Sequence, residues 1–372
     1  MSQLAGTERA HLNFCFTLHR VLAAHGGDSC FSPYSIASAL GLVSRAARGP
    51  AADEVVALLT GGDPDIAKHA ELLRDAAALG EPTGGEAPVL GVSNTLWVWA
   101  DLPLNEAFPD ELATWPGGTV ATAPFVADPE GARRVINTDV ERATRGLIPE
   151  LLPPGTVDPD TVASIVNALY LKVAWAFPFP EAETELADFH APGGTRQVPT
   201  MRQAERLGYA AHAGWQLVEL PAVGGVSATI LLPDGDLAEQ ESTLDDSVLA
   251  ELLSAKQDTM VTLALPKFEL DVRAELTTAL KELGVRTMFT TAADFAGLTD
   301  DPRIVVSDVL HQAVLRIDEQ GLEGAAATAA MMRLVSMPIT DPVTVEVDRP
   351  FLLLVRHATT GMVYFFARVV RP

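Results

Sequence analysis

Strand-like segments that do not alternate regularly with helices constrain the fold of this chain most strongly. From residue 91 onward, runs rich in β-branched and aromatic residues recur between clusters of turn-forming residues, the pattern typical of β-strands. Strands and helices in no βαβ order predict an α+β protein with antiparallel or mixed sheets, not a doubly wound parallel sheet. We expect strands at residues 91–99, 164–171, 216–220, 226–232, 260–268, 309–317, 343–347, 351–357 and 362–370.

Helical patterns are confined to the first part of the chain. Ser32 is a suitable cap for a helix that has Pro33 in its first turn. Asp63 and Asp65 fit a helix start better than a calcium loop, because the Gly and the terminal Glu of such a loop are missing. Apolar residues at helical spacing predict helices over residues 9–25, 34–46 and 64–79.

No segment of the chain has the composition of an interdomain linker. At 372 residues the length alone permits one large domain or two ordinary ones. The Gly- and Pro-rich stretches at 80–88, 149–159 and 192–194 are short and fit surface loops. No internal repeat is found. We therefore expect residues 1–372 to form a single domain.

The acidic balance of the chain limits its partners. Lys plus Arg number 26 against 49 Asp plus Glu, a formal net charge of -23 that repels nucleic acids, heparin-like polyanions and anionic membrane surfaces. No run of eighteen apolar residues occurs, and the N-terminus lacks the pattern of a signal peptide. We expect a cytoplasmic protein as the sequence stands, or a secreted one if a signal peptide has been removed.

The sequence favours a protein without cofactor, metal or catalytic centre. Cys15 and Cys30 stand among apolar residues, which favours two buried thiols over a disulfide between them. The chain has no G-x-S-x-G, P-loop, G-x-G-x-x-G, H-E-x-x-H or C-x-x-C motif. A hydrolase whose catalytic triad is assembled in space stays open as an alternative, because triads are defined by geometry and not by order in the sequence.

The segment from Asp318 to Pro338 is rich in Gly and Ala and lies between two strand-like runs. Propensity alone favours an Ala-rich helix or a flexible connector there, because Ala is the best helix former and Gly the most permissive residue. Residues 309–328 resemble, however, the serpin pattern in which a strand of the main sheet ends in "DE-x-G-x-E-A-A" and continues as the reactive-centre loop. Further serpin-like motifs follow in family order at residues 31–40, 47–55, 136–148, 166–175, 265–268 and 349–351.

This resemblance, which extends from about residue 9 to Pro372, implies a fold and a mechanism. The serpin fold has three β-sheets surrounded by about eight or nine helices and an exposed reactive-centre loop, here about residues 319–342. A serpin is a monomer that inhibits a serine protease as a suicide substrate: the protease forms an acyl-enzyme on the loop, and the cleaved loop inserts into the main sheet. The alternative is a non-inhibitory serpin that acts as a substrate, chaperone or binding protein.

The resemblance also assigns roles to particular residues. The small, uncharged residues after the hinge Glu have little bulk or charge to bury during insertion. Leu322 departs from the Thr that the family commonly has, but it is also uncharged. The hinge comprises Glu319, Gly321, Leu322, Glu323, Gly324, Ala325, Ala326, Ala327 and Thr328; the polar shutter beneath the sheet comprises Ser32, Ser35, Asn167 and His311; Trp175 marks the breach, where insertion begins.

The bond presented to the protease is expected between Val335 and Ser336, by the family's usual count from Glu319. The bonds after Arg333, Leu334 and Met337 remain alternatives, because the loop is longer than in some relatives, although Pro338 after Met337 would suit few proteases. Apolar bait residues favour proteases of chymotrypsin- or elastase-like specificity, whereas cleavage after Arg333 would favour a trypsin-like target.

Overall fold

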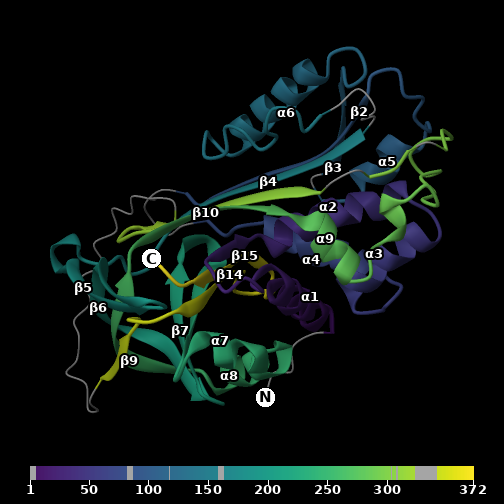
Figure 1. Ribbon diagram of the computed structural model, residues 1–372. Coiled ribbons are helices and arrows are strands. Elements are labelled where there is room, and N and C mark those ends of the chain that lie inside the picture. The colour runs from purple at the N-terminus through teal and green to yellow at the C-terminus, as the bar shows by residue number, and fades with distance from the viewer. Residues whose placement is uncertain are drawn as a thin grey trace.

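The computed structural model describes residues 6–81, 87–116, 118–157, 163–302, 304–306, 309–322 and 342–372. Its α-helices cluster in the first part of the chain, with shorter ones after residue 236 (Figure 1). The helices are α1 (Gly6–Leu22), α2 (Pro33–Ala46), α3 (Pro50–Thr60), α4 (Ala67–Ala77), α5 (Phe108–Ala113), α6 (Pro129–Ala143), α7 (Leu237–Gln240), α8 (Asp246–Ala255) and α9 (Leu276–Glu282).

Side-chain caps explain where α2 and α6 begin. The Ser32 side chain accepts a hydrogen bond from the Ser35 amide at the start of α2, with Pro at the first position. Asp128 accepts from the Gly131 amide at the start of α6, again followed by Pro. The expected helices over 9–25, 34–46 and 64–79 thus correspond to α1, α2 and α4, with ends shifted by a few residues.

Within the described residues, the main sheet has six strands in the order β10-β11-β12-β4-β2-β3. All the pairings are antiparallel except β2 with β3. The two-residue β12 lies between two longer strands, β11 and β4, and pairs with them at only one and two positions. The strands are β2 (Val89–Trp99), β3 (Gly118–Ala123), β4 (Ala163–Ala174), β10 (Phe268–Glu275), β11 (Leu310–Ile317) and β12 (Gly321–Leu322).

The second sheet has nine strands in the parts of the chain that the structure describes, in the order β1-β15-β14-β8-β7-β6-β9-β13 with β5 paired to β6. The 19-residue β6 pairs with β5 and β9 along its first part and with β7 at its end. Because β6 connects these strands, they form one continuous sheet, where the expectation of three sheets in all would count two. The strands are β1 (Ser29–Phe31), β5 (Glu185–Ala191), β6 (Gly194–His212), β7 (Trp215–Ala222), β8 (Val226–Pro233), β9 (Gln257–Pro266), β13 (Val343–Glu346), β14 (Phe351–His357) and β15 (Val363–Val369).

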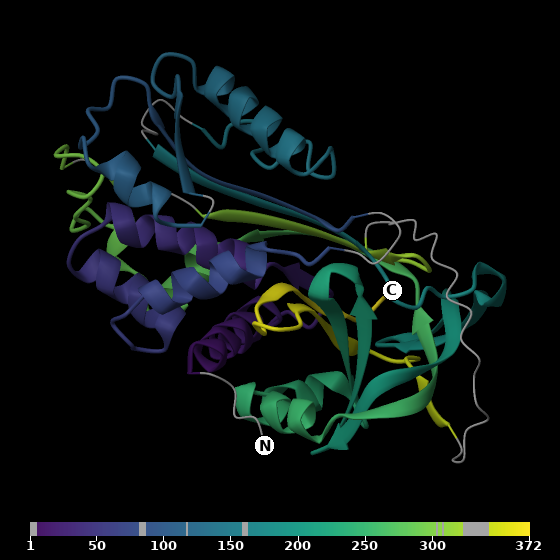
Figure 2. The ribbon, with the colours of Figure 1, turned by 180° about the vertical axis from the view of Figure 1, so that it is seen from behind.

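The two faces of the main sheet are covered differently. Figures 1 and 2 show α6 on one face of β2 and β4, with α2, α3 and α9 on the other. A large apolar core joins the helices of that second face to β14 and β15, and a smaller apolar cluster lies between α6 and the sheet. None of the helices in the described parts of the chain is long and apolar enough to cross a membrane.

Several elements differ from the sequence-based expectation. The single strand expected over 260–268 is wrong: β9 ends at Pro266 and β10 begins at Phe268, with Lys267 between them. The sequence analysis missed the strands β1, β3, β5, β6 and β12, and it expected no helix at α3, α5 or α7 to α9. Cys15 and Cys30 are buried free thiols, as expected.

Candidate functional site

The short strand β12 marks the candidate functional site, because it occupies the place between β4 and β11. Gly321 lies opposite Ala174, and Leu322 lies opposite Val173 on one side and Ile317 on the other. The Leu322 side chain is 1% exposed. β12 is antiparallel to both neighbours, which is the geometry that a longer strand in this place would need.

A tight turn leads from β11 into β12. The Asp318 carboxylate accepts hydrogen bonds from the amides of Gln320 (2.9 Å) and Gly321 (3.1 Å), an Asx-type turn. A Cβ atom added at Gly321 would lie 2.1 Å from the carbonyl oxygen of Val173. Only glycine therefore fits where this turn meets β4.

Trp175, just beyond the end of β4, holds the turn from outside. Its indole Nε1 donates to the carbonyl of Asp318 (2.9 Å), and its backbone amide donates to the carbonyl of Gln320 (2.9 Å). The Trp175 side chain is 1% exposed. The residue expected at the breach thus contacts the start of the loop directly, through one side-chain and one backbone hydrogen bond.

Glu319 is fixed by two side chains from other elements. Its carboxylate accepts from Lys267 Nζ (2.8 Å) and from Thr184 Oγ1 (2.9 Å). Burial alone would raise the pKa of Glu319, but the hydrogen bonds, that from Lys267 above all, hold it below its usual value. Glu319, the residue expected at the start of the hinge, is therefore an anchored carboxylate, although it is only 8% exposed.

The polar residues expected at the shutter form two separate hydrogen-bonded groups. The Ser32 amide donates to His311 Nε2 (3.0 Å), and the Ser32 hydroxyl accepts from the Ser35 amide (3.1 Å). Asn167, on β4, instead donates its side-chain amide to the Asn94 side chain on β2. Burial lowers the pKa of His311 to about 4. The imidazole is therefore neutral at pH 7 and accepts through Nε2.

The remaining expected site residues lie outside the described residues. These are the hinge residues Glu323, Gly324, Ala325, Ala326, Ala327 and Thr328 and the bait residues Arg333, Leu334, Val335 and Ser336.

The sequence analysis gave no role to three residues that the structure brings to the site: Lys267, Thr184 and Asn94. Lys267 and Thr184 stood within or beside recognised motifs, but their partner Glu319 is distant along the chain, 52 positions from Lys267 and 135 from Thr184. Only the three-dimensional fold pairs them.

Comparisons with known proteins agree with this geometry. A family model described as serpin (serine protease inhibitor) matches residues 9–372. An alpha-1-antitrypsin-like protein of Tamias sibiricus is 33% identical over 96% of this chain and 87% of its own length. An uncharacterised serpin-like protein of Thermococcus kodakarensis is 30% identical over 97% of this chain and 84% of its own length.

Solved structures show the same fold. Uncleaved ovalbumin matches with a TM-score of 0.86 at 24% identity, covering 98% of this chain and 99% of that chain. Thyroxine-binding globulin in complex with thyroxine matches with a TM-score of 0.85 at 25% identity, again covering 98% and 99% of the two chains.

Proposed function

The chain belongs to the serpin family, and from this premise we propose that it inhibits serine endopeptidases of chymotrypsin- or elastase-like specificity as a suicide substrate. The protease serine attacks the carbonyl of Val335, the Val335–Ser336 amide bond breaks, and an ester joins the protease to Val335. Ser336 becomes a new amino terminus. The loop then inserts between β4 and β11 before water can hydrolyse the ester.

The observation that carries the proposal is the place and direction of β12. Its ladder with β4 pairs 321 with 174 and 322 with 173, and β4 continues to Ala163. Extended in this register, residues 321–332 would pair with the 12 residues of β4. Each candidate bait bond lies beyond residue 332, so cleavage at any of them would free enough chain to fill the place.

The extended register also pairs chemically suitable residues. Glu323 would lie between Lys172 of β4 and Arg316 of β11, so its charge would meet two cations on the partly exposed face. Thr328 would lie between Asn167 and His311, where its hydroxyl could bond to the shutter residues. Neither position would bury an unpaired charge.

The energy of insertion is sufficient for the proposed mechanism. A strand of 12 residues gains a similar number of backbone hydrogen bonds at about 1 kcal/mol net each. The sum, about 10 kcal/mol, is comparable with the whole stability of a protease domain, roughly 5 to 15 kcal/mol. Insertion can therefore distort the protease that the loop carries, provided that the intact fold is kinetically trapped.

Fast insertion of the loop requires small, uncharged residues in the hinge. Protease turnover is on the order of 10 per second, so insertion must be faster than hydrolysis of the ester. Residues 324–330 are Gly, Ala and Thr, without charge to desolvate and without Pro to remove a ladder donor. This composition supports an inhibitory serpin over the alternative of a non-inhibitory one. We also propose a single domain over residues 1–372, and a monomer.

Incubation of the protein with chymotrypsin and with pancreatic elastase tests the proposal. We expect a complex that survives boiling in SDS, with the mass of the protease added to the larger fragment, and sequencing of the released peptide should begin at Ser336. Cleavage of the loop without any such complex would contradict inhibition and would favour a non-inhibitory serpin, of which ligand binding, as thyroxine-binding globulin shows with thyroxine, is one form. Trypsin serves as the control for cleavage after Arg333.

A further inference from the structure

A groove lies between α6 and strand β2 of the main sheet, and its volume is about 350 Å³. This volume is in the range of clefts that hold small organic ligands. None of the residues of the groove has a role in the proposed inhibition, because none belongs to the hinge, the shutter or the breach. The lining residues are Trp97 of β2 and, from α6, Arg134, Val135, Thr138, Asp139 and Arg142.

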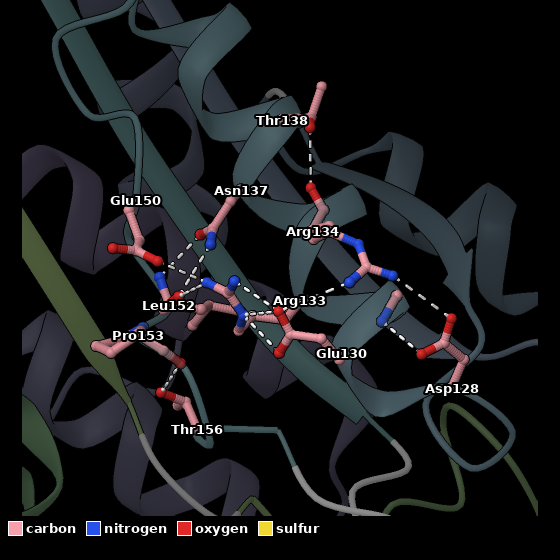
Figure 3. Close-up of polar contacts among 11 residues, drawn as sticks. Asp128, Glu130, Arg133, Arg134, Asn137, Thr138, Glu150, Leu152, Pro153 and Thr156 are labelled. Atoms are coloured by element: carbon pink, nitrogen blue, oxygen red, sulfur yellow. Dashed lines mark hydrogen bonds and ion pairs between the residues drawn. The ribbon is translucent and has the colours of Figure 1, made fainter.

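The helical repeat brings the polar groups of the groove together. Side chains four residues apart share one side of a helix, so Arg134, Thr138 and Arg142 follow one another along the groove. Arg133, one residue away, instead donates to the Glu150 carboxylate (2.7 Å). Figure 3 shows the guanidinium groups of Arg133 and Arg134 with different partners. The groove therefore belongs to a separate side of α6.

Trp97 is the aromatic wall of the groove. Its side chain is 6% exposed and packs in one apolar cluster with Ile136 and Val140 of α6, which holds the ring in place. Its indole N–H has no hydrogen-bond partner among the described residues. A buried donor without a partner costs free energy, and a ligand oxygen that reaches it recovers that cost. The wall thus offers an apolar surface and one unused donor.

Val135 adds an exposed apolar side chain to the same groove. It is 45% exposed, and it is one of three large apolar side chains with this degree of exposure in the described part of the chain. A single exposed valine is ordinary on a protein surface. Here, however, Val135 and Trp97 line one groove, so a single ligand can contact both of them.

Arg134 supplies a charge that is not used up by the protein. Its side chain is 61% exposed, and the nearest carboxylates are those of Asp128 (3.7 Å) and Glu130 (3.8 Å). Both distances exceed the length of a hydrogen bond. The two carboxylates have closer donors, since Asp128 accepts from the Gly131 amide (2.8 Å) and Glu130 from Arg133 (2.7 Å). Arg134 therefore keeps donors for an anion in the groove.

Arg142 marks the far end of the groove. It lies eight residues from Arg134, which is about 12 Å along the axis of an α-helix. Its guanidinium donates to the Asp139 carboxylate, and its side chain is 81% exposed. Because Arg142 already has a close carboxylate partner, Arg134 is the stronger site for the anionic group of a ligand.

We propose that this groove binds an organic anion with a flat apolar body, such as an aromatic carboxylate or sulfonate. The anionic group pairs with Arg134, and the apolar body packs against Trp97 and Val135. The formal net charge of -23 repels small anions that gain no apolar contact, so the body of the ligand is as necessary as its charge. This inference does not rest on the proposed function.

Two fluorescent probes test the two parts of the site. One is 8-anilinonaphthalene-1-sulfonate, and the other is N-phenyl-1-naphthylamine, which has the same rings without the sulfonate. Titration of the intact protein gives a dissociation constant for each probe. We expect the sulfonate to bind about tenfold more tightly than the neutral probe, as for one charge-assisted hydrogen bond. Arg134→Met should remove this difference, and Val135→Ser should weaken the binding of both probes.

Arg133→Met is the matched control. Arg133 is the neighbour of Arg134 on α6, but it donates to Glu150 and to the Leu152 carbonyl (2.9 Å) and does not line the groove. Its substitution should leave both dissociation constants within about twofold of the wild type. Equal affinity of wild type and Arg134→Met for the sulfonate, or an equal loss in Arg133→Met, would overturn the proposal.

Nuclear magnetic resonance of the indole groups locates the bound probe in the wild-type protein. The chain has five tryptophans, and the spectrum of Trp97→Phe identifies the indole N–H signal of Trp97. Addition of the sulfonate should shift this signal more than those of the other tryptophans. A Trp97 signal that does not move, or equal shifts of all the indole signals, would show that the probe binds elsewhere and would contradict the site.

Discussion

Leu322 lies opposite Val173 of β4 in an antiparallel ladder and is 1% exposed. Gly321 and Leu322, at the start of the proposed hinge, therefore already lie between β4 and β11, while Asp318 and Trp175 anchor the turn before them. Insertion of the loop would extend an existing strand instead of nucleating a new one. This lowers the entropy that must be lost in the first step.

Gly321→Ala tests this starting position. The new Cβ would lie 2.1 Å from the Val173 carbonyl and 2.8 Å from the Ala174 Cα, so β12 must move away from β4. We expect a several-fold fall in the fraction of chymotrypsin trapped per cleaved inhibitor, measured by titration of residual protease activity. Gly324→Ala, which keeps the hinge small and uncharged, is the control and should trap protease like the wild type.

Ala326→Arg tests passage of the hinge into the sheet. In the extended register, residue 326 lies on the same face as Leu322, so the guanidinium would be buried without a partner, at a cost of several kcal/mol. The variant should be cleaved as an ordinary substrate, with no complex on an SDS gel. Thr340→Arg places the same charge beyond the segment that inserts and should leave inhibition intact. Unchanged inhibition by Ala326→Arg would contradict insertion.

The sequence predicted the elements whose signals are local. The strands β11, β14 and β15 are runs of apolar and β-branched residues between clear turn signals, and each lies within two residues of its expected bounds. The start of α2 follows from a Ser cap followed by Pro. Such patterns need no knowledge of the rest of the fold.

The missed elements depend on distant partners. β6 begins with an exposed, polar stretch, so no alternation marks it as a strand, and its pairing with β5 and β9 holds it in place. The two-residue β12 is a strand only because β4 and β11 flank it. Likewise, the sequence predicted that Glu319 belongs to the hinge, but not that Lys267 and Thr184 anchor it.

Lys267→Met tests the anchor of the hinge. The side chain of Lys267 is 45% exposed and the side chain of Glu319 is 10% exposed, so solvent screens the pair and its loss should destabilise the intact protein by only about 1 kcal/mol. The pKa of Glu319 is held below its usual value, so the stabilisation is full at neutral pH and is lost as pH falls through that lowered pKa.

Urea unfolding checks this prediction. The midpoints of wild type and Lys267→Met should differ at pH 7 and converge below about pH 4, where carboxylates protonate. A difference that persists at low pH would show that Lys267 acts through packing and not through Glu319.

The lowered pKa of His311 predicts that the protein loses stability in mild acid. Its pKa in the fold is about 4, below the ordinary value for histidine of about 6.5, because burial disfavours the charged form. The unfolded chain therefore binds the proton first, and stability falls as pH decreases from about 6.5 to about 4, by up to roughly 3 kcal/mol from this group. Burial also lowers the pKa of His69 to about 4, so His69 adds to the same loss of stability in mild acid.

His311→Gln keeps an acceptor for the Ser32 amide and removes the titrating group. Urea unfolding between pH 7 and pH 4 should show a shallower loss of stability than in the wild type, whereas the exposed His25→Gln should follow the wild-type curve. Identical pH profiles for His311→Gln and wild type would contradict a neutral, buried His311.

The thermal unfolding midpoint before and after a single cut in the loop tests the central claim most directly. If the cut loop enters the sheet as a new strand and adds about 10 kcal/mol of hydrogen bonding, the midpoint of this 372-residue chain should rise by roughly 10 to 15 °C. A crystal structure of the cut form should then show Thr328 between Asn167 and His311. A cut protein that melts at or below the temperature of the intact one, with the loop outside the sheet, would contradict the claim.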